Sequence, residues 1–352
     1  MTCFFDSVVN KRNANEDSYC KMELALNHEA RVCSLVVADG MGGLAAGKDY
    51  SSAAVKLWYR DLVRTLLSDE FSMNSLENQL ELLKEHTVRT YARIGRTLYK
   101  KGLDSGMRGG TTLTTVIHFW NSFLIANCGD SPVYGIRDGQ VELLSEIQNL
   151  AGQMVREGKT RPGSLLYYQN KNRLMAYVGG REEVHPYMRV VDSRDYDGII
   201  LGSDGAFGSL DQEEIEWILG EAAEPGDMIR TLFDAARAKG EEDNQTAILY
   251  YPRGIADQYY SQAGYHGDEE RLSSDFGEDD SRESDVRHSH DKMVRNTSFF
   301  ETGRQEGLPH DGREDEDYGE ADWELVPIRR NRIRLPDVRG LARRLVIRIR
   351  RK

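Results

Sequence analysis

The stretch CSLVVADGMGG, residues 33–43, contains the pattern on which the fold assignment depends. Its first six residues, Cys33–Ala38, are apolar apart from one serine, and they run directly into Asp39 and Gly40. A short apolar run that ends at a turn signal is typical of a buried β-strand. We therefore predict a strand that holds an aspartate carboxylate rigidly at its end, beside a glycine that permits close approach of the backbone to a ligand.

The same arrangement recurs along the first 250 residues. Further strand-like runs are Thr111–His118, Phe123–Asn127, Gly198–Leu201 and Thr246–Tyr251. Asp130 and Asp204 follow two of these runs, Asp243 precedes the last, and Glu16 and Asp17 add two carboxylates near the start of the chain. A single Asp-Gly corner is most often only a turn. Several such corners in one domain predict a shared acidic site.

Helical periodicity falls into two pairs of segments, Ala53–Leu67 with Leu76–Tyr99, and Asp211–Leu219 with Pro225–Ala238. Asp211 followed by Glu214 predicts a capping box at the start of the third helix. The aromatic residues Trp58 and Trp217 fall on apolar helix faces, so we expect both in the core. Grouped strands with clustered helix pairs predict an α+β layered domain rather than alternating βαβ units.

The composition changes sharply after residue 252. Residues 253–324 contain 8 basic and 21 acidic residues, a net charge of −13, and few aliphatic side chains, so we expect a disordered acidic linker. Residues 325–352 reverse the sign with 11 basic residues and Asp337. Apolar residues from Val338 to Ile349 recur at steps of three and four, which predicts a basic amphipathic helix.

The overall charge and the cysteines restrict the class of protein. The net charge of −12 over 352 residues makes specific nucleic-acid binding unfavourable. The four cysteines are widely spaced, with no Cys-x-x-Cys pair, so neither a disulfide framework nor a zinc site is expected. With no secretory signal and no apolar run of spanning length, we expect a cytoplasmic protein.

Converging carboxylates repel one another and need cations for neutralisation. Oxygen-only ligands suit Mg²⁺ or Mn²⁺ and not zinc. The acidic site therefore predicts a divalent metal site.

Taken in order, the motifs resemble those of the metal-dependent protein phosphatase family, type 2C, in its bacterial form. The matching motifs are Arg12-x-x-Asn15-Glu16-Asp17, Asp39-Gly40-Met41-Gly42-Gly43, Gly109-Gly110-Thr111-Thr112, Asn127-Cys128-Gly129-Asp130-Ser131, Ser203-Asp204-Gly205 and Asp243-Asn244-Gln245-Thr246. The resemblance spans about residues 3–251 and implies a catalytic domain over residues 1–252, with a flap at about residues 151–192. It implies a four-layer αββα sandwich, in which helix pairs flank two antiparallel β-sheets, with metals at one end.

The resemblance also implies roles for individual residues. Asp39 would bridge two Mn²⁺ or Mg²⁺ ions, Asp204 and Asp243 would complete one ion, and the Gly40 carbonyl would help to hold the other. Glu16 and Asp17 would act through or beside metal-bound waters, and Asp130 with Asp204 would offer a looser third metal site. Arg12 would clamp the phosphate of the substrate.

The implied reaction is hydrolysis of phosphoserine and phosphothreonine in proteins by a hydroxide that bridges the two ions, in opposition to a serine/threonine kinase. Two alternatives remain open on the same fold. One is a catalytically silent module that binds phosphoproteins, and the other is a hydrolase of small phosphate esters. The flap also carries basic residues, which would steer an acidic phosphopeptide or simply form a solvated face: Arg156, Lys159, Arg161, Lys171 and Arg173.

Two positions depart from the family pattern. Pro132 stands where arginine is usual, and Leu144–Asn149 lacks the usual Asp-His pair. Neither change removes a metal ligand, so they bear on substrate preference and on the protonation of the leaving group.

Three roles are open for residues 325–352: binding an anionic membrane surface, binding an acidic partner or segment, or a solubilising tail without a specific role. The first makes the protein peripheral at the membrane. The membrane role predicts that the intact chain floats with anionic lipid vesicles, because each basic residue near the surface contributes about 1 kcal/mol, and that a chain ending at Glu324 does not. Equal flotation of the two would exclude the membrane role.

Overall fold

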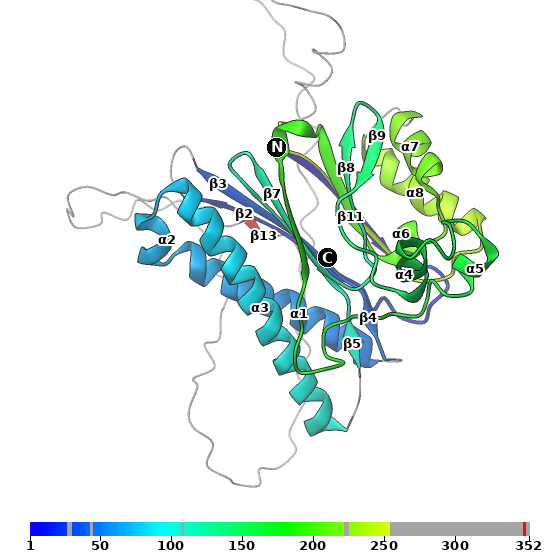
Figure 1. Cartoon of the computed structure of the whole chain (residues 1–352), viewed down its shortest axis with the longest axis horizontal. Coiled ribbons are helices and arrows are strands. Elements are labelled where there is room, and N and C mark those ends of the chain that lie inside the picture. Colours follow the sequence, from blue (N-terminus) through cyan, green and yellow to red (C-terminus); the bar gives the residue numbers. More distant parts are fainter. Residues whose placement is uncertain (27–29, 43–44, 107–108, 222–224, 254–347, 350–352) are drawn as a thin grey trace, which may run out of the picture. The chain divides into compact units, whose positions relative to one another are not determined.

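The computed structural model describes residues 1–26, 30–42, 45–106, 109–221, 225–253 and 348–349. In this part of the chain two antiparallel sheets lie face to face, with helices on the outer side of each (Figure 1). The predicted α+β sandwich with flanking helix pairs is thereby confirmed. None of the helices in these ranges combines the length and apolar character needed to cross a membrane.

The first sheet has five strands in the order β1 (Thr2–Val8), β12 (Gln245–Tyr251), β11 (Gly198–Gly202), β8 (Val133–Arg137) and β9 (Gln140–Leu143). The second has six, in the order β10 (Tyr187–Asp192), β7 (Ser122–Cys128), β6 (Leu113–Phe119), β3 (Arg31–Ala38), β2 (Ser18–Ala25) and β13 (Arg348–Ile349). A small ribbon pairs β4 (Gly40–Met41) with β5 (Gly110–Thr111).

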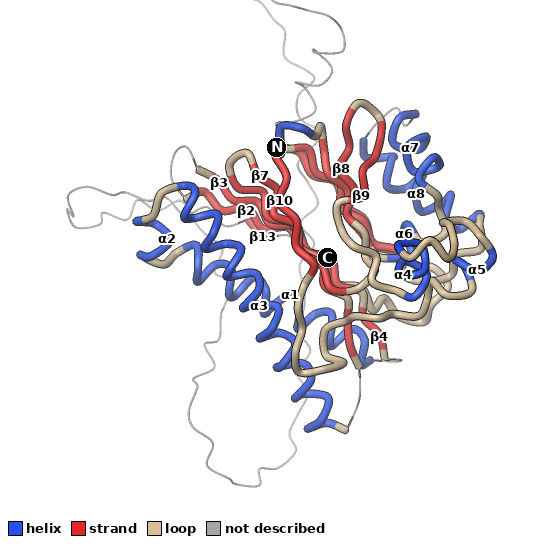
Figure 2. Tube along the Cα trace, viewed as in Figure 1, coloured by secondary structure: helices blue, strands red, loops and turns tan. Residues whose placement is uncertain are grey.

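The helices form two groups (Figure 2). Beside the six-stranded sheet lie α1 (Ala45–Leu66), α2 (Asp69–Met73) and α3 (Leu76–Ser105). Beside the five-stranded sheet lie α6 (Asp204–Phe207), α7 (Gln212–Glu221) and α8 (Pro225–Ala238). The segment between β9 and β10 contains α4 (Leu150–Arg156) and α5 (Leu165–Tyr168), and a 3₁₀ turn covers Ser193–Asp195.

Strand β3 shows why the run at residues 33–38 is apolar on both faces. Val32 and Val36 pack with the helix layer of α1 and α3, whereas Cys33, Leu35 and Val37 pack between the two sheets. A strand that is covered on both faces cannot alternate polar with apolar residues. Its one serine, Ser34, accepts a hydrogen bond from the indole nitrogen of Trp58 at 3.2 Å.

The predicted capping box is confirmed: the Glu214 amide donates to Asp211 Oδ1 at 2.9 Å, and the Asp211 amide donates to Glu214 Oε2 at 2.9 Å. The prediction for Trp217 is wrong. Trp58 is fully buried, but Trp217 is 64% exposed, because α7 is covered on one face only.

Two predicted boundaries need correction. Residues 187–192 of the predicted flap form β10, which pairs with β7 and belongs to the sheet. The predicted helix in the basic tail is wrong at its end, because Arg348 and Ile349 form an antiparallel bridge with Glu23 and Met22 of β2. An edge strand offers unpaired backbone groups, and Arg348 and Ile349 pair with those of β2. Of residues 253–324 the structure describes only Arg253, and of residues 325–352 only Arg348 and Ile349. The predictions for the other residues of these two segments lie outside the described residues.

Candidate active site

The predicted acidic residues meet at one end of the sandwich because of strand direction. Asp17 precedes β2 and Asp39 follows β3, and these antiparallel strands pair Ser18 with Ala38. Asp130 follows β7 at the same edge of that sheet. In the other sheet Asp204 follows β11 and Asp243 precedes β12, and these strands are also antiparallel neighbours.

The carboxylates are close enough to perturb one another. Burial raises the pKa of Asp39 well above its usual value, and the charges of the other four aspartates raise it further. Burial likewise raises the pKa of Asp204, with Asp243 adding to the effect and a hydrogen bond with Asp39 opposing it. The four aspartates whose charges raise the pKa of Asp39 are Asp17, Asp204, Asp130 and Asp243. The structure therefore brings together all the aspartates that the sequence singled out.

Asp17 is the most enclosed member of the set, with 2% of its surface exposed. Its Oδ2 accepts hydrogen bonds from Ser203 Oγ at 2.8 Å and Thr246 Oγ1 at 2.6 Å. Its Oδ1 is buried and has no hydrogen-bond partner. Burial raises the pKa of Asp17 to about 6 against the effect of the two hydroxyl groups. An unpartnered buried carboxylate oxygen among other carboxylates is the donor that a cation would complete.

Asp39 is fixed through its main chain. Its amide donates to Thr112 Oγ1 at 2.9 Å, and its carbonyl accepts from the Thr112 amide at 2.8 Å and from Thr111 Oγ1 at 2.9 Å. The threonines of the Gly109–Thr112 motif thus hold Asp39 from 72 and 73 residues further along the chain, a contact that the motif itself did not reveal.

Gly40 is required by close packing of the backbone. A Cβ atom at this position would lie 2.1 Å from the Gly47 carbonyl oxygen and 2.7 Å from the Glu16 carbonyl oxygen. The glycine therefore allows the loop before β2 and the first turn of α1 to meet behind Asp39.

Arg12 lies at the rim and is 58% exposed in its side chain. Its Nη2 forms an ion pair with Asp243 Oδ2 at 2.7 Å, so the predicted phosphate clamp contacts a predicted metal ligand. The loop that carries Arg12 is fastened by Asn244, whose Nδ2 donates to the carbonyls of Val9 and Ala14 and whose Oδ1 accepts from the Glu16 amide. Glu16 lies beside this pair; burial raises its pKa, while Arg12 lowers it.

Asp130 is 5% exposed, and its Oδ2 accepts a hydrogen bond from Asn149 Nδ2 at 3.0 Å. Burial raises its pKa to about 7, and Asp204 adds to that rise. Asn149 also caps α4 by accepting from the Gly152 amide at 2.8 Å. Asn149 is the last residue of Leu144–Asn149, the segment that departs from the family pattern. It is thus a hydrogen-bond partner of Asp130.

A cavity of about 470 Å³ opens beside Arg12, Asp204 and Asp243. This volume lies within the range of small-molecule sites. Lys171 enters it from the segment between α5 and β10 and pairs with Glu241 Oε2 at 3.1 Å. Lys171 was one of several flap cations named from the sequence. Of the others, Arg156 pairs with Glu146 at 3.4 Å and Lys159 pairs with Glu157 at 2.6 Å, so they do not form a free basic face.

Lys48 is a member of the site that sequence reasoning missed. Its Nζ donates to the Asp17 carbonyl at 2.5 Å and to Ser18 Oγ at 3.2 Å. Ser51, one turn further along α1, donates to the Glu16 carbonyl at 2.5 Å. These contacts tie α1 to the acidic loop, and no short motif would have signalled them.

The donor chemistry fits a hard divalent cation, because the site offers carboxylate oxygens and no thiolate or imidazole. Among the described residues, however, no three His, Cys, Asp or Glu side chains already stand in a coordinating arrangement. Asp243 is held by Arg12, so a cation at this position competes with the guanidinium.

Comparisons with known proteins agree on one family. A family model described as protein phosphatase 2C matches residues 10–247. The serine/threonine phosphatase Stp of Listeria monocytogenes is 28% identical over 218 residues, covering 61% of this chain and 82% of that protein. The protein phosphatase PhpP of Streptococcus pneumoniae is 25% identical over 245 residues, covering 68% and 93%. The crystal structure of the serine/threonine phosphatase Stp1 from Staphylococcus aureus has the same fold, with a TM-score of 0.62 at 24% identity over 72% of this chain and 96% of that one.

The raised pKa values predict a stability effect in the absence of metal. The folded protein binds protons to Asp17 and Asp39 that the unfolded chain releases, so its stability falls as the pH rises from about 4 through 6. Asp39→Asn removes one of the repelling charges. We expect it to raise the free energy of unfolding at pH 7.5 by about 1–3 kcal/mol in chelator, with a gain that shrinks as the pH falls toward 4.

Urea unfolding at several pH values measures this difference. Asp234→Asn, which changes an exposed carboxylate paired with Arg237 on α8, serves as the control and should show no such gain. A lower stability of Asp39→Asn at pH 7.5 would contradict the repulsion argument.

Proposed function

Because this chain belongs to the protein phosphatase 2C family, we propose that it hydrolyses phosphoserine and phosphothreonine in proteins with two Mn²⁺ or Mg²⁺ ions as cofactors. Family membership makes it a protein-serine/threonine phosphatase, in line with the names of its relatives in Listeria and Streptococcus. The observation that carries the proposal is the group of five mutually repelling aspartates at one end of the sandwich, with an unpartnered oxygen on Asp17.

We assign the holding of the two ions to Asp39, with Asp204 and Asp243 as further ligands that one ion would take and the Gly40 carbonyl as a ligand that the other would take. Glu16 and Asp17 would orient water near the ions, and Asp130 with Asp204 would offer a third, weaker site. When bound, the ions supply a water that is acidic enough to attack near neutral pH, and they neutralise charge on the phosphoryl oxygens.

The chain itself positions the phosphate. Arg12 is exposed at the rim, so its guanidinium can leave Asp243 and form a paired hydrogen bond with two phosphoryl oxygens. Attack by water forms one P–O bond as the bond to the serine or threonine oxygen breaks, and that oxygen takes a proton. The products are the free hydroxyl side chain and inorganic phosphate.

The proposed partners are phosphorylated proteins and a serine/threonine kinase whose phosphorylation the enzyme reverses. For residues 325–352 the proposed roles are binding to an anionic membrane surface or to an acidic partner. Both roles rest on the sequence alone and are separate from the proposal for the active site.

The direct test is hydrolysis of a phosphothreonine peptide with and without Mn²⁺. We expect Mn²⁺-dependent release of phosphate by the full chain and a loss of at least about 100-fold in kcat for Asp39→Asn, because the shared ligand is altered. Asp234→Asn should retain full activity. An inactive wild-type protein would favour the silent phosphoprotein-binding alternative, and an active Asp39→Asn would refute the metal assignment.

A second experiment separates the role of Arg12 from that of the metals. Arg12→Ala should reduce kcat/KM for the peptide by about 10- to 100-fold, mainly through a higher KM, because the phosphate loses a charged, paired hydrogen bond. Steady-state kinetics at saturating Mn²⁺ measures this change. Arg31→Ala, which breaks an exposed ion pair with Glu23 at the far end of β3, provides the control. An unchanged KM for Arg12→Ala would show that Arg12 only balances the charge of Asp243.

A further inference from the structure

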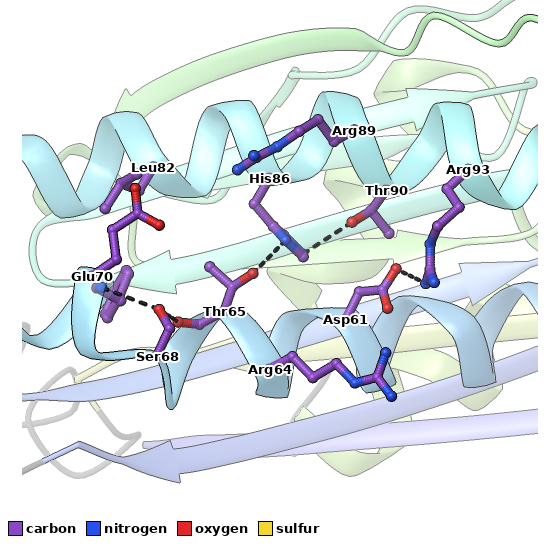
Figure 3. A pocket seen from close by; sticks show the side chains of 11 residues that line it. Asp61, Arg64, Thr65, Ser68, Glu70, Leu82, His86, Arg89, Thr90 and Arg93 are labelled. Carbon is purple, nitrogen blue, oxygen red and sulfur yellow. Dashed lines mark hydrogen bonds and ion pairs between the residues drawn. The ribbon is translucent and has the colours of Figure 1, made fainter. Parts of the chain in front are cut away.

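A second cavity, of about 360 Å³, lies between α1 and α3 (Figure 3). Its lining includes Arg64, Thr65, His86, Arg89 and Arg93. On α1, Asp61, Arg64 and Thr65 lie 16 to 20 positions beyond Ala45, where the helix starts at the acidic site, so a rise of 1.5 Å per residue places the cavity about 24–30 Å along the helix from that end. The cavity is therefore separate from the proposed active site.

The floor of the cavity is neutral and rigid. His86 is 4% exposed, and its ring contacts Trp58 with a centroid distance of 5.9 Å. Its Nδ1 and the Thr65 hydroxyl are 2.7 Å apart, and its Nε2 and the Thr90 hydroxyl are 3.3 Å apart. Burial and, to a smaller extent, the charge of Arg89 together lower the pKa of His86 to about 4. The imidazole is thus uncharged at neutral pH and is fixed from both sides, as Figure 3 shows.

Three arginines, Arg64, Arg89 and Arg93, and two acidic residues, Asp61 and Glu70, line the cavity, so its lining is basic by one charge. Asp61 forms ion pairs with both Arg93 and Arg60, so one carboxylate serves two guanidinium groups. Burial lowers the pKa of Arg93, and the nearby Arg60 adds to the effect. Arg64 and Arg89 form no hydrogen bond or ion pair with any residue in the described part of the chain.

Such a basic cavity is unexpected in a chain with a net charge of −12. The side chains of Arg64 and Arg89 are exposed at the cavity and have no partner among the described residues, so an anion can bind them without breaking an existing ion pair. Guanidinium groups bind phosphate through two parallel hydrogen bonds, and several can share one tetrahedral group. The volume lies within the range of small-molecule sites and is too small for a folded segment.

We propose that the cavity between α1 and α3 binds a small molecule that carries a phosphate group. Arg64 from α1 and Arg89 from α3 hold the phosphate from two sides, and the neutral His86 floor with its apolar neighbours Phe71 and Leu82 accepts the uncharged part of the ligand. This site is independent of the catalytic phosphate position at Arg12.

The test follows the ring signals of His86 by NMR in the full chain with ¹³C-labelled histidine, assigned with His86→Gln. The probes are inorganic phosphate and phenylphosphonate, which the phosphatase cannot hydrolyse. We expect a saturable shift of the His86 signals with a Kd below about 1 mM. Arg64→Ala/Arg89→Ala should raise the Kd at least about tenfold, and Arg64→Lys/Arg89→Lys should give an intermediate value because it keeps the charge but loses the paired donors.

Arg96→Ala/Lys100→Ala removes two positive charges from exposed positions of α3 outside the cavity and should leave the Kd within about twofold. Equal weakening by this control would show a general charge effect and overturn the proposal, as would no saturable shift up to about 10 mM probe. A shift with a polyglutamate peptide but with neither probe would also overturn it, in favour of an acidic protein partner.

Discussion

At one end of the sandwich the fold has to hold several buried carboxylates close together, although they repel one another. Desolvation and the neighbouring charges raise the pKa of Asp39, and of Asp17 and Asp130 to about 6 and about 7, so ionising the group opposes folding. The domain tolerates this cost because the rest of the sandwich is closely packed. Three layers of apolar contact, between the sheets and under each helix pair, supply stability far from the site.

The supports around the site are mostly neutral. Hydroxyl groups of Ser203 and Thr246 bond to Asp17, an amide bonds to Asp130, and two threonines hold the main chain of Asp39. Neutral donors fix a carboxylate without cancelling its charge. The negative charge of the site therefore stays available to a cation, whereas a full set of arginine or lysine partners would have cancelled it.

The sequence predicted the layered fold and the acidic site because both follow from local patterns. An apolar run covered on both faces and a carboxylate at its end are visible in β3 without any knowledge of its neighbours. Contacts made across the fold were not visible. Lys48 reaches Asp17 from another element, and Asn149 reaches Asp130 across 19 residues. Trp217 was misplaced because a helical period shows that a face is apolar but not what covers it.

Arginine has two different roles at the two cavities. At the catalytic end Arg12 pairs with Asp243 at 2.7 Å, so the free site has an internal counter-ion that a cation and a phosphate would have to displace together. Binding of metal at Asp243 would thus free the guanidinium for the substrate, and the two events would favour each other. Between α1 and α3, Arg64 and Arg89 have no such counter-ion among the described residues. Since no ion pair has to be broken there, an anion can bind between α1 and α3 without a metal. Arginine would thus bind phosphate together with a metal near the start of α1, and without a metal near its end.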